Sequence, residues 1–380
     1  MRIPVHRAVV LAGASALVGL GLGLSVPAVA SGPSAPPGSR AESEAAFPHM
    51  DHVFVIMMEN TGYNSLLTPS NTNTTYIQYL AQTYGLATHY YGVTHTSLPN
   101  YVAATSGSTW GSHSDDEAQA NDGYFNHFSL FDELSQAHVS WAGYMESMPS
   151  AGFTGTKSST GLYVRKHNPF MQYPDIFDSP RLADNVMPLT TLTTALRSGH
   201  VAQFVWITPN VCNDMHGGAA TCPYATSPTS PNQAILYQDG DAFLHTWITA
   251  ITHSKSWTGN SAIFVTWDEG SYADTAPYGP LDDSGCCDSP VLAKQPVTPV
   301  TATGGDLAGG NVYGGGHVPM IVIARNGARH ATDSAPANHY SLLQTIELNW
   351  NLPLLGNAGD KVQVQSLAPL LLPGHAHSDQ

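Results

Sequence analysis

The stretch His52-Val-Phe-Val-Ile-Met-Met-Glu-Asn60 is the part of the sequence that decides the fold. Its first seven residues form a short, mostly apolar run, which predicts a strand buried on both faces of a parallel sheet. Glu59 and Asn60 follow this run directly. Ligands of open parallel sheets bind beyond the carboxyl ends of the strands. The stretch therefore predicts a core strand and, at its end, part of a binding site.

Similar apolar runs recur along the chain and alternate with helical patterns. Further strands are predicted over 139–145, 204–208, 262–267 and 318–324, and helices over 76–84, 99–105, 125–137, 236–253 and 340–350. Alternating strands and helices are typical of a mainly parallel sheet covered by helices. We therefore expect an α/β fold.

The first 30 residues have the pattern of a secretory signal peptide. Arg2 and Arg7 precede an apolar run over 8–24, and Ala28-Val-Ala30 matches a cleavage site. The same run can be interpreted as a membrane anchor, but it is short for a span and contains four glycines. We therefore expect a secreted protein.

The mature chain is expected to begin with a flexible lead-in over 31–48, which is rich in Pro, Ser, Gly and Ala. A single domain over 49–372 is expected to follow, without an integral membrane segment. Within it, 270–316 is rich in Gly, Pro, Ser and Asp and lacks periodicity. This segment is expected to be an inserted loop beside the site, the alternative being a disordered surface insertion.

The chain is acidic and sparsely charged. Its formal net charge is −15 and charged residues make up 11% of it. An acidic field repels nucleic acid and anionic membrane surfaces, so we expect no nucleic-acid partner. The 18 His, 17 Tyr and 7 Trp residues argue against disorder.

Four cysteines are present, at positions 212, 222, 286 and 287. In an exported chain, Cys212 and Cys222 can close a short loop, and four cysteines allow three pairings. Cys286 and Cys287 either form a bridge between neighbours or pair elsewhere. A zinc-thiolate site is disfavoured because the chain has no CxxC pairs.

Polar residues follow three of the predicted strands. Glu59 and Asn60 follow the first, Asn210 and Asn213-Asp-Met-His216 follow the strand over 204–208, and Asp268 and Glu269 follow the strand over 262–267. Carboxylate and amide oxygens are ligands for hard divalent cations. Each acidic residue taken singly is more often a helix cap or a solvated charge, but their recurrence at strand ends favours a metal site.

The candidate nucleophile lies in His95-Thr-Ser97-Leu-Pro99-Asn-Tyr101. A hydroxyl ahead of a helix beginning at Pro99 meets free N–H groups and the positive end of the helix dipole, which suits a phosphoryl oxygen. The alternative is an ordinary N-cap, which local sequence alone favours. Ser97 is the first candidate and Thr96 the second.

Two histidines are candidates for contacts with the phosphoryl group or the leaving alcohol, His167 beside Lys166, and His216. Chance placement competes with this interpretation, since the chain has 18 histidines. The chain contains neither a GxSxG elbow nor a HExxH helix. These absences disfavour an α/β-hydrolase esterase and a zincin protease.

The sequence resembles the bacterial phosphoesterase family of acid phosphatases and phospholipases C, within the alkaline-phosphatase-like superfamily. It is most similar to short secreted actinobacterial acid phosphatases, some of which act on phosphoinositides. The resemblance spans about residues 51–355 and is carried by seven segments in order, Met58–Tyr63, His95–Thr109, Lys166–Phe170, Thr208–His216, Thr266–Gly270, Gly314–Pro319 and Asn338–Ser341.

The resemblance implies a three-layer α/β/α fold and a divalent metal ion of unspecified identity. It implies that the metal is held by Glu59, Asn60, Asp268 and Glu269, that Ser97 is transiently phosphorylated, and that His167 and His216 contact phosphoryl oxygens. Lys166 belongs to the basic motif, and Asn100 and Asp214 would support these groups. His317 is a further candidate.

The expected function is hydrolysis of phosphomonoesters through a phosphoserine intermediate. A phospholipid or phosphoinositide is a candidate substrate. One alternative is a phospholipase C acting on phosphodiesters, and another is a non-catalytic wall-associated or lipid-binding protein. A sulfatase is disfavoured because Ser97-Leu-Pro-Asn-Tyr101 lacks the arginine of the formylglycine motif.

Overall fold

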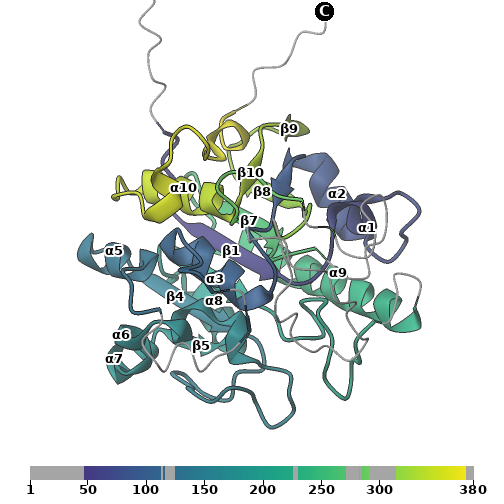
Figure 1. Cartoon of the computed structure of the whole chain (residues 1–380), viewed down its shortest axis with the longest axis horizontal. Helices are drawn as coiled ribbons and strands as arrows, with labels where there is room; N and C mark the ends of the chain where they lie inside the picture. Colours follow the sequence, from purple (N-terminus) through teal and green to yellow (C-terminus); the bar gives the residue numbers. More distant parts are fainter. Residues whose placement is uncertain are drawn as a thin grey trace, which may run out of the picture. The chain divides into compact units, whose positions relative to one another are not determined.

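The computed structural model contains a twisted central sheet with helices packed around it (Figure 1). It describes residues 47–112, 114–115, 125–225, 230–270, 282, 284–290 and 314–373. Within these residues the sheet has the strand order β5-β4-β6-β1-β7-β8-β2-β9, and β10 pairs with β3 separately. The strands are β1 (Val53–Met58), β2 (Gly85–Ala87), β3 (Tyr90–Tyr91), β4 (Trp141–Met145), β5 (Val186–Pro188), β6 (Phe204–Thr208), β7 (Ala262–Trp267), β8 (Met320–Ala324), β9 (Ala331–Asp333) and β10 (Ala337–Asn338).

Strand β1 lies between β6 and β7 and runs parallel to both. Val53 pairs with Phe204 on one side and with Ala262 on the other, and Met58 pairs with Trp267. Every residue of these three strands is buried, which explains their nearly continuous apolar sequences. Strand β8 is antiparallel to both of its neighbours. The prediction of an α/β fold with a mainly parallel sheet is therefore confirmed.

The helices form two groups by their packing. Helix α3 packs on α5 and α10, while α9 packs on α2 and α8, and Figure 1 shows α5 and α10 to the left of β1 and α2 and α9 to its right. This arrangement gives the expected three layers. The helices are α1 (Tyr63–Leu67), α2 (Thr75–Thr83), α3 (Ser97–Ser106), α5 (Leu130–Gln136), α6 (Pro174–Phe177), α7 (Pro180–Ala183), α8 (Leu192–Ser198), α9 (Pro231–Thr252) and α10 (His339–Asn349).

Three predicted helix starts are wrong. Helix α3 begins at Ser97 rather than Pro99, because a proline is tolerated anywhere in a first turn, where its missing N–H is not needed. Helix α5 begins at Leu130 because Ser129 and Asp132 form a capping box. Helix α9 begins at Pro231, after Ser230, whose hydroxyl accepts a hydrogen bond from Gln233 N–H.

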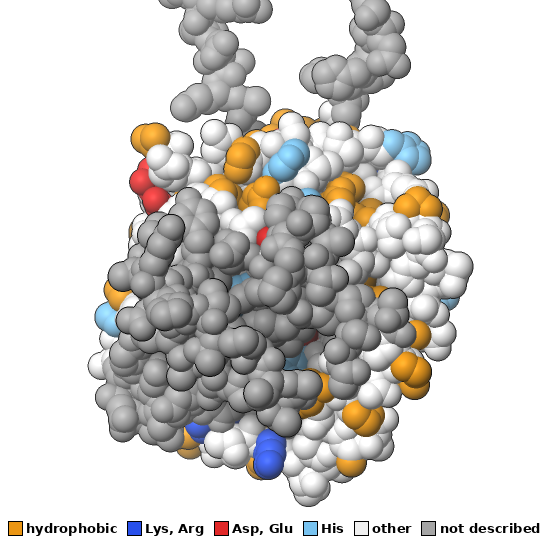
Figure 2. Space-filling view, turned by 45° about the vertical axis from the view of Figure 1, so that its right-hand side comes forward, with side chains coloured by type: hydrophobic (Ala, Val, Ile, Leu, Met, Phe, Trp, Pro, Cys, Tyr) orange, Lys and Arg blue, Asp and Glu red, His pale blue; other side chains and the backbone are white. Residues whose placement is uncertain are grey.

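Several expectations lie outside the described residues. These are the signal peptide over 1–30, the lead-in up to residue 46, and most of the inserted loop over 270–316. Among the helices that the structure describes, none has the length and apolar character needed to span a bilayer. On the face shown in Figure 2, charged side chains of the described residues appear only at scattered points, which fits the low charged content.

Candidate active site

The carboxyl ends of β1 and β7 bring Glu59, Asn60 and Asp268 together. Because Met58 and Trp267 are paired, the residues that follow them are neighbours at the sheet edge. The N–H of Asn60 donates to Oδ1 of Asp268 over 3.1 Å. Glu59 and Asp268 are completely buried. The parallel register thus places these three predicted metal residues in one cluster.

The hydroxyl of Ser97 points into this cluster. Its Oγ donates to Oε2 of Glu59 over 2.9 Å, and Ser97 is the first residue of α3. The other oxygen of Glu59, Oε1, accepts from the Tyr101 hydroxyl over 2.8 Å and lies 3.3 Å from Nε2 of His167. Tyr101 also stacks on the His167 ring. Glu59 therefore sits between the candidate nucleophile and the candidate histidine.

Asn100 holds the backbone that leads into Ser97. Its side-chain oxygen accepts from the N–H groups of Val93 and Thr94 at 2.9 and 3.1 Å. Its amide group donates to the carbonyls of Thr94 and Thr96 at 2.6 and 3.0 Å. The loop and the first turn of α3 are thereby tied together, which fixes where Ser97 lies.

Asp214 links the two candidate histidines. Its Oδ2 lies 3.1 Å from Nδ1 of His167, and its Oδ1 accepts from the backbone N–H of His216 over 2.7 Å. Nδ1 of His216 donates to the carbonyl of Gly217 over 2.8 Å. With Nδ1 carrying the hydrogen in each ring, Nε2 of both histidines keeps a lone pair.

The pKa values of both histidines are displaced in the same direction. Burial first, and then the nearby Lys166 ammonium, lowers the pKa of His216 to about 3. The same two causes hold the pKa of His167 well below its usual value. Both rings are therefore neutral in the free protein at mildly acidic pH.

Lys166 enters the site from the short 3₁₀ turn over Arg165–His167. Its ammonium donates to Oδ2 of Asp115 over 2.6 Å and lies 3.4 Å from Nε2 of His216. Oδ1 of Asp115 accepts from the backbone N–H of Leu98 over 3.0 Å. Asp115 was not among the predicted residues, because it belongs to a polar loop that follows no strand.

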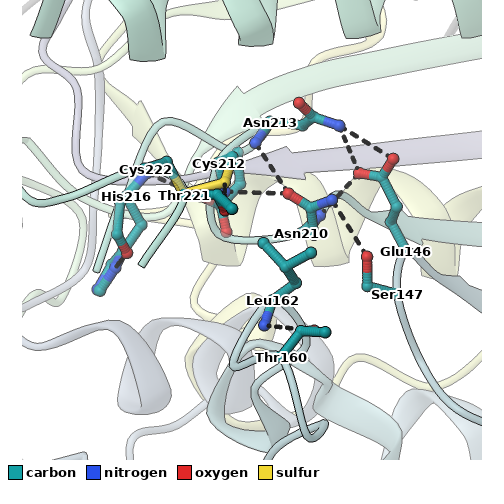
Figure 3. Close-up of a disulfide and its surroundings, with 12 residues drawn as sticks. Glu146, Ser147, Thr160, Leu162, Asn210, Cys212, Asn213, His216, Thr221 and Cys222 are labelled. Atoms are coloured by element: carbon teal, nitrogen blue, oxygen red, sulfur yellow. Dashed lines mark hydrogen bonds between the residues drawn. A yellow bond between two sulfur atoms is a disulfide. The ribbon is translucent and has the colours of Figure 1, made fainter. Parts of the chain in front are cut away.

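Glu146 anchors the loop that carries Asp214 and His216 (Figure 3). Both of its oxygens accept from the Asn213 side chain at 2.9 Å, and Oε2 also accepts from the N–H of Asn210 at 2.9 Å. Glu146 also escaped prediction, although it follows β4 directly. The pattern of polar residues at strand ends, applied to the strand over 139–145, would have found it.

A disulfide closes the same loop. Cys212 and Cys222 are bonded, which is one of the pairings that the sequence allows. Cys286 and Cys287 are bonded to each other, so the open question of their pairing is answered by a bridge between neighbours. All four cysteines are used, which rules out the zinc-thiolate site.

Glu269, the fourth predicted metal residue, is bound by a histidine. Its Oε2 forms a close ion pair with Nδ1 of His95, whose Nε2 donates to the Asp282 carbonyl over 3.0 Å. Burial alone would lower the pKa of His95, but Glu269 and the Asp282 carbonyl outweigh burial and raise it. His317 has its ring stacked on Tyr63 and its Nε2 donating to the Thr88 carbonyl, while its backbone N–H donates to Oδ2 of Asp282 over 2.9 Å.

The carboxylates of the cluster carry more negative charge than the buried site can stabilise alone. Burial, followed by repulsion from Asp268 in the case of Glu59 and from Glu269 in the case of Asp268, raises the pKa of both carboxyls well above their usual values. For Asp214, burial also raises the pKa strongly and repulsion from Asp268 adds to it. A bound cation would relieve this repulsion.

Buried oxygen and nitrogen atoms that lack hydrogen-bond partners also indicate a place for a cation. Among the described residues, Oδ1 of Asn60, Oδ2 of Asp268 and Nε2 of His167 are buried without a hydrogen-bond partner. In addition, Glu59, His167 and His216 each offer a ligand atom within 4.8 Å of the others. The residues present therefore fit a divalent metal ion, with Glu59 common to an oxygen-rich set and a histidine set.

Comparison with known proteins agrees with this geometry. A phosphate-repressible acid phosphatase of Penicillium chrysogenum is 27% identical over 80% of this chain, which spans 60% of that relative. A phosphatidylinositol-3-phosphatase of Mycobacterium tuberculosis is 25% identical to this chain. The match covers 83% of this chain and 81% of the length of that relative. The fold is shared with a solved structure from Bacteroides thetaiotaomicron connected with glycosaminoglycan metabolism, at a TM-score of 0.51 and 12% identity over 85% of this chain and 82% of that one.

A sequence model of the Phosphoesterase family matches residues 68–353, which is more than half of the chain. The matched range contains Ser97, Lys166, His167, Asp214, His216, Asp268 and Glu269, and begins after Glu59 and Asn60. The chain belongs to the Phosphoesterase family.

Proposed function

We propose that this protein is a secreted phosphomonoesterase that attacks phosphorus with Ser97. The observation that carries the proposal is the 2.9 Å hydrogen bond from Ser97 Oγ to Glu59 Oε2, within a buried cluster of acids at the sheet edge. Family membership and the acid phosphatase and phosphatidylinositol phosphatase relatives support a phosphoric ester as substrate. The two disulfides support an exported protein, since such bonds persist in oxidising compartments.

The side chains of the site suit a two-step reaction. In the first step a bond forms between Ser97 Oγ and phosphorus, the bond from phosphorus to the ester oxygen breaks, and the leaving oxygen takes up a proton from water. The hydroxyl proton of Ser97 is directed along its hydrogen bond to Glu59 Oε2. In the second step water attacks the phosphoserine, which releases phosphate and restores the hydroxyl. Lys166 and the first turn of α3 supply positive potential for the phosphoryl oxygens.

His167 and His216 are proposed to contact the phosphoryl oxygens as the substrate binds. Both rings are neutral beforehand, with lone pairs at Nε2. An arriving phosphoryl anion raises a nearby imidazole pKa, so that Nε2 can take up a proton and donate a hydrogen bond. Asp214 holds His167 in the orientation that this contact needs.

The residues proposed to hold a divalent metal ion are Glu59, Asn60, Asp268 and Glu269. The free oxygens of Asn60 and Asp268 support this set, whereas His95 already binds one oxygen of Glu269. Such an ion would neutralise phosphoryl charge and lower the pKa of the attacking hydroxyl. The protein's own part is to keep these oxygens close together and out of water.

A phosphoinositide is the lipid substrate that the relatives favour, since the chain spans 81% of the mycobacterial phosphatidylinositol-3-phosphatase. The proposal is tested with purified protein on p-nitrophenyl phosphate, bis-p-nitrophenyl phosphate and phosphatidylinositol 3-phosphate, with and without a chelator. Ser97→Ala is expected to abolish turnover. Ser106→Ala, at the other end of α3, serves as the matched control and is expected to keep it.

Wild-type turnover in Ser97→Ala would overturn the nucleophile assignment, and Thr96→Ala would then be the next variant to measure. A rate on the diester above that on the monoesters would favour the phospholipase C type of activity instead. No turnover on any phosphoester, together with no uptake of a divalent metal ion, would favour a non-catalytic binding protein.

A further inference from the structure

The carboxylate of Asp115 occupies two hydrogen-bond donors beside Ser97. Its Oδ1 accepts from the backbone N–H of Leu98, the residue after Ser97, and its Oδ2 accepts from the Lys166 ammonium. A backbone N–H in the first turn of a helix and a lysine ammonium are both donors that bind phosphoryl oxygens. Asp115 therefore already takes up hydrogen bonds that a phosphoryl group would otherwise receive.

The charge balance around these donors is unfavourable for a strongly negative substrate. The positive charge of Lys166 is offset in part by the Asp115 carboxylate, with which it forms an ion pair over 2.6 Å. The other charged or titratable groups that interact with Asp115 or Lys166 include His167, His216, Asp214, Glu59, Glu269 and Tyr224. None of these side chains adds a fixed positive charge, since both histidines are neutral in the free protein.

We propose that Asp115 is a specificity-determining residue, which makes the site select phosphoryl groups with a single negative charge over those with two. This inference rests on the proposed function and names the charge state of its substrate. A phosphomonoester carries one negative charge below its second pKa of about 6 and two above it. A phosphodiester carries one negative charge at every pH. Asp115 therefore favours monoesters only at acidic pH, where they also carry a single negative charge.

The ionisation of Asp115 supports this role. Burial alone would raise the pKa of Asp115, but Lys166 outweighs burial and lowers that pKa. The carboxylate therefore remains charged at the acidic pH where the monoester has lost its second charge. Repulsion between Asp115 and a substrate then depends on the charge of the substrate alone.

The wild-type protein provides the first test. We expect kcat/KM for p-nitrophenyl phosphate to fall about tenfold for each pH unit above about 6, following the singly charged fraction of the ester. For bis-p-nitrophenyl phosphate, whose charge does not change, no such fall is expected. Parallel profiles for the two substrates would overturn the inference while leaving the proposed function intact.

The variant Asp115→Asn provides the second test, because it keeps an oxygen for Leu98 N–H and removes the charge. For the monoester, we expect the ratio of kcat/KM at pH 8 to kcat/KM at pH 5 to be about tenfold higher in the variant than in the wild type, mainly through a lower KM at pH 8. For the diester, we expect little change in this ratio. The matched control is Asp241→Asn, since Asp241 accepts from Tyr76 and Ile77 N–H at the start of α2 but lies outside the site.

Two results would contradict the role of Asp115. An Asp115→Asn profile with the wild-type shape and a lower kcat would mean that Asp115 only positions Lys166. A rise of the same size in Asp241→Asn would mean that the effect is not local. If wild-type protein lacks turnover on every phosphoester, the proposed function itself fails, and this inference fails with it.

Discussion

The Ser97 hydroxyl donates to Oε2 of Glu59 across 2.9 Å, although the two residues lie 38 positions apart in the chain. Glu59 is placed by the end of β1, and Ser97 by the first turn of α3. Neither element contributes the contact alone. The parallel register of the sheet and the Asn100 hydrogen bonds before α3 together bring the hydroxyl to the acidic cluster.

Replacing Lys166 with methionine is expected to weaken phosphoester binding in the transition state. The change removes the ammonium that lies between Asp115 and His216 and keeps much of the side-chain volume. We expect kcat/KM to fall by about 10²- to 10³-fold. Steady-state kinetics on p-nitrophenyl phosphate measures this, with Lys157→Met, at an exposed position, as the control. A fall of less than about threefold would contradict a role for Lys166 in binding the phosphoryl group.

Glu146→Gln is expected to loosen the loop that presents Asp214 and His216. Both Glu146 oxygens accept hydrogen bonds, and the glutamine amide would place a donor against the Asn213 amide group. We expect about 1–3 kcal/mol less stability and roughly tenfold lower kcat/KM, because small displacements of catalytic groups are costly. Denaturant unfolding and kinetics measure the two effects. Asp184→Asn, a change at an exposed carboxylate, should alter neither.

Removing the Cys212–Cys222 bond by replacing both residues with serine is expected to destabilise the fold. The bond closes a loop with a sequence separation of 10, for which chain entropy predicts about 3 kcal/mol. Activity should decrease as well, since Asp214 and His216 lie within that loop. Denaturant unfolding and p-nitrophenyl phosphate turnover provide the measurements. Unchanged stability would show that Glu146 and its partners hold the loop without the bond.

The strand ends were predictable from the sequence because each polar pair follows a short apolar run directly. That pattern located Glu59, Asn60, Asp268 and Glu269, and the parallel register then determined that they are neighbours. The pattern does not report how a side chain is used. It gave no sign that His95 pairs with Glu269, since that contact depends on the path of the loop before α3.

Asp115 was missed because a loop supplies it, whereas Glu146 was missed although it directly follows a predicted strand. Asp115 reaches Leu98 and Lys166 from a segment without periodicity, and its partners are 17 and 51 positions away. Short elements such as β5, α6 and α7 were missed for a related reason. They contain three or four residues, too few to show a period, and their positions are set by packing against the larger elements.

Stability is expected to fall as the pH rises, because Glu347 of α10 is buried with Oε2 unpaired. Burial, aided by repulsion from Glu133, raises the pKa of Glu347 to about 9, although the N–H of Leu355 donates to its Oε1. The folded protein therefore keeps a proton that the unfolded chain releases above pH about 4.3. Because the native state binds more protons between these two values, the free energy of unfolding decreases over that window.

The variant Glu347→Gln cannot ionise, and it retains an oxygen for the Leu355 N–H. We expect it to unfold like the wild type near pH 4.5 and to be more stable at pH 8, by roughly 2–5 kcal/mol, since each pKa unit corresponds to about 1.4 kcal/mol. Urea unfolding at pH 4.5, 6 and 8 measures the difference. Glu133→Gln should show a smaller effect of the same sign, because burial raises the pKa of Glu133 only to about 7. If the stabilities of Glu347→Gln and wild type differ equally at all three pH values, the proton is not held at Glu347.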